Sequence, residues 1–423
     1  MGYDSIINGR TNKYETTSFH IYLEGESPIT HTGYKVVGIR DHASFVHEYV
    51  HYIQQITTPC GIKYNTFFIN TLFLFRGFVD DRETVPVPVT PDEFIQGAKE
   101  FESELREKNG SKDFLSGNIG AIEIAPADIA KAKINDTAVN IGVYDFENDR
   151  VFEEGFQFGY MCVIESMAHL IQSLVNPDLY HREIPYKSAQ LIYDKIRPDL
   201  KDDIKLLIAI CYTSLFFNNP GHAFFEILES ANKEESGIQL YQRYMRDHSR
   251  TFRGKEMPNY QMMHILMDEF LNRWEALLGN KLIYMKKMME NCKYESADGD
   301  SVLLNFIYKE DLSTNETLDK LIDFYGFPAI DSKCSDIVYP RDNTNKPYIE
   351  TAALLSLELI YARITEHDKK KECIRLPICD RISRENDKEL IDQHCAELQW
   401  RKQLPCLFTN GLSYWRMSGK VFE

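Results

Sequence analysis

The segment FVHEYVHYIQQI (45–56) constrains the fold most, because it mixes apolar and ionisable residues at helical spacing. As a helix over 41–58 that stops before Pro59, it has apolar residues at the i, i+3, i+4, i+7 spacing of a packed helix. These residues are Val46, Tyr49, Val50, Ile53 and Ile56. His47 and His51 lie one turn apart on the adjacent side, with Glu48 beside them. The fold must therefore bury one side of this helix and supply partners for two imidazoles and a carboxylate on the next.

Two imidazoles at this spacing can ligate one zinc ion. Glu48 is about 100° further round the helix, where its carboxylate can reach a water beside the ion. The alternative is a half-buried helix that carries two histidines without a metal. The metal hypothesis is favoured because the polar residues are turned away from the apolar side of the helix.

The motif HEYVH (47–51) resembles the active-site helix of zincin metallopeptidases, which carries the pattern HExxH. The resemblance implies that His47 and His51 bind zinc and that Glu48 is the general base. The longer metzincin pattern is absent, because Gln54 stands at its glycine position and Thr57 at its third histidine. The third ligand must then come from elsewhere, as in the gluzincin type, where a glutamate on a later helix completes the site.

The candidate for that glutamate is Glu165, in CVIESMAHLIQ (162–172). Most of its neighbours are apolar, and a carboxylate buried without a partner is costly, so a metal ion would offset that cost. His169 follows one turn later, where gluzincins commonly have an aspartate. It could hydrogen-bond to a ligand or be the third ligand itself. Glu165 could alternatively be a core carboxylate paired with His169 or with an arginine.

Three protein ligands with one open position would suit hydrolysis of a peptide bond by a metal-activated water. Such a reaction also needs a donor that stabilises the oxyanion. His222, at the start of a helix in NNPGHAFFEILE (218–229), is one candidate, although an ordinary residue at a helix start is the simpler interpretation. The expected partner is a peptide or protein substrate cleaved selectively, and a regulatory partner is plausible but unknown.

A second hypothesis is a metal-containing binding or scaffold protein whose zincin-like site is structural or degenerate. The presence of Glu48 argues against it, because a structural site needs no base. A helical di-metal oxidase is disfavoured, since that class uses Glu-x-x-His at i, i+3. In this chain the paired residues, His47 with His51 and Glu165 with His169, are spaced i, i+4.

The expected fold is α+β and predominantly helical, with a small sheet. We expect a zincin-like catalytic domain over 1–295, with a long insertion at about 60–150, and a C-terminal accessory region over 296–423. Strands are expected within 18–39 and at 120–125 and 137–145. Helices are expected at 154–177, 187–196, 202–217, 221–232, 237–246, 259–290 and 349–365.

The net charge of −16 disfavours broad binding of nucleic acid. No signal peptide and no membrane span is predicted, so the nine cysteines are expected to be reduced thiols in a cytoplasmic protein. Four cysteines crowd the C-terminal tail with His394. They are Cys373, Cys379, Cys395 and Cys406. Their spacing lacks CxxC, so buried thiols are favoured there over a second, structural zinc.

Overall fold

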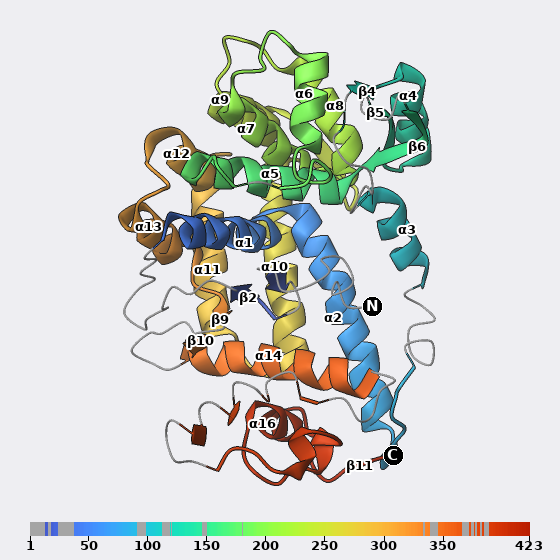
Figure 1. Cartoon of the computed structure of the whole chain (residues 1–423), viewed down its shortest axis with the longest axis vertical. Helices are drawn as coiled ribbons and strands as arrows, with labels where there is room; N and C mark the ends of the chain where they lie inside the picture. Colours follow the sequence, from blue (N-terminus) through green and yellow to red (C-terminus); the bar gives the residue numbers. More distant parts are fainter. Residues whose placement is uncertain are drawn as a thin grey trace.

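The computed structural model describes residues 13–15, 18–23, 38–90, 99–111, 119, 121–145, 150–179, 181–332, 335–338, 346–365, 372–373, 376, 379–380, 383–384 and 389–423. These residues form a predominantly helical α+β structure with small sheets (Figure 1). The expected second strand at the end of 18–39 lies outside the described residues, apart from its last positions.

One four-stranded sheet lies next to the motif helix, in the order β1 (Lys13–Glu15), β2 (His20–Leu23), β9 (Ala329–Ser332) and β10 (Ser335–Val338). β1 runs antiparallel to β2, and β9 runs parallel to β2. The region 296–423, expected as an accessory part, thus supplies strands to the sheet beside the motif helix. One continuous hydrophobic core also runs from Phe19 to Phe422. The division of the chain into two domains at 295/296 stays a prediction.

The expected insertion at 60–150 begins with a long helix and continues as a small α/β unit. Its helices are α2 (Pro59–Asp80), α3 (Lys99–Asn109) and α4 (Pro126–Asn135). The predicted strands at 120–125 and 137–145 are confirmed as β4 (Ala121–Glu123) and β5 (Val139–Asp145), which form a sheet with β6 (Arg150–Phe158). The two short remaining sheets pair β3 (Thr84–Val85) with β11 (Val421–Phe422), and β7 (Ser249–Phe252) with β8 (Lys255–Pro258).

Two of the helix predictions were wrong in extent. The predicted helix at 154–177 is strand β6 followed by α5 (Tyr160–Val175), because RVFEEGFQF pairs with β5 as an aromatic-rich strand. The predicted helix at 259–290 is two helices, α10 (Asn259–Leu278) and α11 (Ile283–Glu295). Gly279 separates them with a φ of 68°, the left-handed conformation that commonly ends a helix.

The other predicted helices lie close to their expected positions. They are α6 (Ser188–Ile196), α7 (Ile204–Ser214), α8 (Pro220–Ser230), α9 (Gly237–Gln242) with the π-helix Arg243–Asp247, and α14 (Lys346–Thr365). Three further helices were not predicted: α12 (Val302–Lys309), α13 (Asn315–Tyr325) and α16 (Leu407–Tyr414). Within the described residues, no helix combines the length and the apolarity that crossing a membrane requires.

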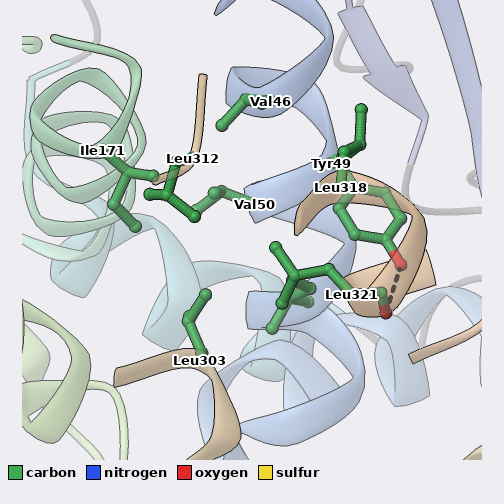
Figure 2. A pocket seen from close by; sticks show the side chains of 9 residues that line it. Val46, Tyr49, Val50, Ile171, Leu303, Leu312, Leu318 and Leu321 are labelled. Atoms are coloured by element: carbon green, nitrogen blue, oxygen red, sulfur yellow. Dashed lines mark hydrogen bonds between the residues drawn. The ribbon is translucent and has the colours of Figure 1, made fainter. Parts of the chain in front are cut away.

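The motif helix, α1 (Ile39–Thr57), is held by its apolar side. Tyr49 donates a hydrogen bond to the carbonyl of Gly326 (2.6 Å), and Tyr52 donates to the carbonyl of Tyr325 (2.8 Å), at the end of α13. Beneath Val46 and Val50 lies a cavity of about 10 Å³ lined by apolar side chains (Figure 2). It is too small and too apolar to hold water well, so it is a packing gap and not a substrate site.

α5 packs alongside α1 and starts at a crowded junction (Figure 1). A Cβ on Gly159, just before α5, would lie 2.4 Å from the carbonyl oxygen of Lys108, and a Cβ on Gly221 would lie 2.5 Å from that of Phe158. Glycine is therefore required at both positions for these backbones to approach each other. This close packing fixes the start of α5, and so the direction in which the side chains of its second turn point.

Candidate metal centre

α1 places His47, Glu48 and His51 next to α5. All three belong to an amphipathic helix whose opposite side is anchored by its tyrosines, so the motif side is held against the neighbouring helix. His47 and Glu48 are only 5% and 7% exposed. Ionisable groups at this depth require partners close by.

Glu165, on the second turn of α5, supplies that partner. Its Oε2 lies 3.3 Å from the Nε2 of His47 and 3.3 Å from the Nε2 of His51. The two Nε2 atoms are 3.2 Å apart. The structure thus brings together the three residues that the sequence named as ligands, and they are the only group of metal-ligating side chains found within the described residues. Their role as ligands stays a prediction.

The triangle of ligand atoms has the size that a tetrahedral ion needs. Zinc bound at about 2.0–2.1 Å to nitrogen and oxygen gives a tetrahedron with edges of about 3.3–3.4 Å. The three observed edges, 3.2, 3.3 and 3.3 Å, match that length. Two imidazoles and one carboxylate are also a donor set that suits zinc. The residues present therefore fit a small divalent ion held at three corners, with the fourth corner available.

The charges at the triangle already favour a cation. Burial by itself lowers the pKa of His51, but the Glu165 carboxylate outweighs it and raises that pKa to about 9. Burial raises the pKa of Glu165, and the two histidines reverse this and hold it well below its usual range. At neutral pH without a metal, His51 therefore carries a proton, and the same negative charge that holds this proton would attract a metal ion.

Glu48 has a different electrostatic environment. Its pKa is raised, first by burial, although His47 and His51 act in the opposite direction and Glu165 adds to the rise. A carboxylate whose pKa is shifted upward is suited to accept and return a proton near neutral pH. Glu48 thus lies within electrostatic range of the triangle without being one of its corners.

Gln54 orients His51, a role that the sequence analysis did not assign. The side-chain amide of Gln54 donates to the carbonyl of Ile164 on α5 (3.1 Å). Its Oε1 therefore faces the Nδ1 of His51 at 2.9 Å and accepts that N–H. With Nδ1 protonated, the Nε2 lone pair of the neutral ring is directed to the triangle. The Nδ1 of His47, in contrast, is buried and has no hydrogen-bond partner among the described residues.

His169 does not join the triangle. Its ring meets that of His181 edge-on, with centroids 4.9 Å apart, and its Nδ1 is also buried without a partner in the described part of the chain. Burial, followed by His181 and then His47, lowers its pKa to about 3, so the ring is neutral at pH 7. His169 therefore contacts His181 and does not belong to the group of ligand atoms.

His181 and Tyr186 were not found from the sequence. The ring of His181 stacks on that of His47, with centroids 5.8 Å apart and an angle of 8° between the planes. The ring centroid of Tyr186 lies 4.6 Å from that of His181 and 5.9 Å from that of His47. Burial, and next His47, lowers the pKa of His181 to about 4. Both residues come from the segment between α5 and α6, which has no periodic pattern, so only the folded chain reveals that they adjoin the motif.

His222 lies elsewhere. It is in the first turn of α8, with its Nε2 4.0 Å from Glu226. Burial lowers its pKa, and the charged groups that also act on it are Glu226, Lys133, Asp136 and Glu229, none of which belongs to the triangle. The structure therefore does not bring His222 to the candidate centre.

The C-terminal cysteines form no second cluster within the described residues. The backbone N–H of Cys373 donates to the carbonyl of Cys395 (2.8 Å), which brings these two segments together. The Sγ of Cys395, however, accepts a hydrogen bond from Lys402 (2.7 Å). An ammonium group at that distance competes with a cation for the sulfur.

Comparison with known proteins identifies no relative: no protein family, no curated protein and no solved structure matches this chain.

Proposed function

We propose that this protein is a zinc-dependent peptidase of the gluzincin kind. The observation that supports it best is the triangle formed by His47, His51 and Glu165, whose edges fit a tetrahedral zinc ion. Glu48 follows the first histidine directly and lies beside the triangle. A structural site would have no use for such a carboxylate.

Each residue then has a chemical role. Zinc, when bound, would lower the pKa of a water molecule to about 7 and polarise a peptide carbonyl. Glu48 accepts the proton of the attacking water and later gives it to the leaving amine. Gln54 holds His51 in the tautomer that ligates.

His181 and Tyr186 are the candidates for stabilising the oxyanion. Within the described residues, neither ring nitrogen of His181 has a hydrogen-bond partner, and the ring is neutral at pH 7. A neutral imidazole N–H and a phenol O–H beside the ligand histidine are the kind of donors that a developing oxyanion needs. In this proposal they replace His222.

The experiment combines metal analysis with hydrolysis. The chain is purified without added zinc, and its metal content is measured by mass spectrometry for the parent and for Glu48→Gln. Both should hold about one zinc. The parent should cleave members of a quenched-fluorescence peptide library, and Glu48→Gln should lower kcat by about 10²–10⁴-fold.

Two outcomes would contradict the proposal. Equal rates for the parent and Glu48→Gln would exclude Glu48 as the base. One zinc per chain with no peptide cleaved by the parent would favour the binding or scaffold hypothesis instead.

A further inference from the structure

A lysine and a cysteine are in direct contact in the C-terminal segment. The Nζ of Lys402 donates to the Sγ of Cys395 at 2.7 Å. Sulfur is a large atom, and another hydrogen bond to sulfur in this chain, from Tyr52 to Met288, is longer at 3.0 Å. The amine nitrogen and the sulfur are therefore close enough for a single atom to bridge them.

Both side chains are buried, and each is the main polar partner of the other. Cys395 is 5% exposed and Lys402 is 7% exposed. The other partner of Nζ is the carbonyl of Leu390 at 2.6 Å, and within the described residues no carboxylate forms an ion pair with it. A buried ammonium requires a negative partner. Burial lowers the pKa of Lys402, but its hydrogen bond to Cys395 outweighs burial and raises that pKa.

Stability alone does not account for this pair. Apolar side chains of similar volume often serve a buried position as well as an ion pair does. What the pair adds is chemistry, because an amine and a thiol are both nucleophiles and the fold holds them together. Cys395 also lies just beneath the surface, since its neighbours Gln393, Ala396 and Glu397 are exposed. A small oxidant can therefore reach the sulfur.

We propose that Cys395 and Lys402 form a covalent modification site for hydrogen peroxide, at which one oxygen atom comes to bridge Sγ and Nζ. The site is separate from the candidate metal centre and does not depend on the proposed function. Its product is an N–O–S link between the two side chains.

The reaction consumes two peroxide molecules. The sulfur attacks one peroxide oxygen, the O–O bond breaks, and the thiol becomes a sulfenic acid with release of water. The amine nitrogen attacks the second peroxide in the same way and becomes a hydroxylamine, again with release of water. The hydroxylamine oxygen then attacks the sulfenic sulfur, the S–OH bond breaks, and a third water leaves. Sulfur and nitrogen each lose two electrons, and the two peroxides accept all four.

The observed distance favours a bridge through oxygen over a direct bond. An S–N bond is much shorter than the 2.7 Å contact, whereas an N–O and an O–S bond that meet at one oxygen span about this distance. The hydrogen bond from Nζ to the carbonyl of Leu390 also opposes movement of the nitrogen onto the sulfur. Insertion of oxygen thus requires less rearrangement than direct condensation.

The link would fasten a segment that contacts α14. Residues 395–402 include Gln399, whose side chain accepts a hydrogen bond from Arg363 on α14 and donates to the carbonyl of Cys395 at 3.3 Å. Closing a loop covalently reduces the conformational freedom of the opened segment. Oxidation should therefore hold this segment more firmly against α14.

The test measures the mass of the modified chain. The full-length protein is reduced with dithiothreitol, desalted and treated with hydrogen peroxide, and the remaining thiols are alkylated. Trypsin cuts after Lys388, Arg401 and Arg416, so the link should join peptide 389–401 to peptide 402–416. The product should have the summed mass of the two peptides with one oxygen atom more and two hydrogen atoms fewer. Fragmentation should place the link at Cys395 and Lys402.

Reduction and substitution should each abolish this product. Two dithiothreitol molecules restore the thiol and the amine, with release of one water. Lys402→Arg keeps a positive charge beside the sulfur but lacks the primary amine, so it should give none of the product, and neither should Cys395→Ser. Lys420→Arg is the matched control, because Lys420 donates to the carbonyls of Asp80 and Arg82 and should leave the product unchanged.

Four results would overturn the inference. They are joined peptides that lack the added oxygen, a disulfide from Cys395 to Cys373 or Cys406, oxidation of Cys395 to sulfinic acid equally in the parent and in Lys402→Arg, and a parent that stays unmodified. The measurement involves neither zinc nor hydrolysis, so the site and the peptidase can fail independently.

Discussion

Helices α1 and α5 each carry two ionisable residues four positions apart, but the structure uses the two pairs differently. On α1, His47 and His51 direct their Nε2 atoms to one point. On α5, Glu165 reaches that point, whereas His169 turns to His181. The i, i+4 spacing places two side chains on one face of a helix. What each side chain contacts depends on the neighbouring segment, here the one that carries His181.

The clearest test of this difference between Glu165 and His169 is to remove one member of the α5 pair at a time. Glu165→Ala should lower the zinc content from about one per chain to near zero, because only two ligands remain. His169→Ala should retain about one zinc, since its ring is not at the triangle. Mass spectrometry of both variants, purified in parallel, gives the answer. Loss of zinc with His169→Ala and not with Glu165→Ala would assign His169 as the third ligand.

The next largest effect is expected at His181, the residue to which His169 turns. His181→Ala should lower kcat by about 10²–10³-fold, the loss typical of removing one oxyanion donor, while the zinc content stays near one. The rate is measured on the library peptide that the parent cleaves fastest. His222→Ala is the control, because His222 lies with Glu226 and away from the triangle. An unchanged kcat for His181→Ala would show that the stack on His47 only packs the ligand.

The same comparison shows how far the sequence could predict the site. The phase of FVHEYVHYIQQI determines both the buried side of α1 and the adjacent position of its histidines, so periodicity was sufficient there. Glu165 could be named because a carboxylate among apolar neighbours requires a partner. His181 and Tyr186 could not be named, since their proximity to His47 depends on long-range packing.

Strand β6 was missed for a related reason. RVFEEGFQF mixes phenylalanines with charged residues and runs directly into the apolar helix α5, so the sequence did not mark the boundary between them. Its pairing with β5 decided its conformation. Short stretches of this kind are ambiguous between helix and strand until their partner is known.

A smaller effect on zinc binding is expected at Gln54, which orients one histidine of the α1 pair. Gln54→Ala removes the acceptor that holds the Nδ1–H of His51, so zinc should bind about 10–100-fold more weakly. Competition with a chelator measures the change. Gln55→Ala, one position further on, is the control, because the side chain of Gln55 is directed to Tyr14 on β1. Equal zinc affinity for the parent and Gln54→Ala would mean that Glu165 alone orients the ring.

The smallest effect is expected on the opposite side of α1. Tyr49→Phe removes the hydroxyl that donates to the carbonyl of Gly326 at 2.6 Å and leaves that buried acceptor unpaired. The free energy of unfolding should fall by about 1–3 kcal/mol, as measured by denaturant titration. Zinc affinity should stay unchanged, since the ring keeps its packing and the triangle is on the other side. If zinc binding weakened together with stability, the two sides of α1 would be coupled, and the position of the ligand histidines would depend on how firmly the tyrosine side is held to α13.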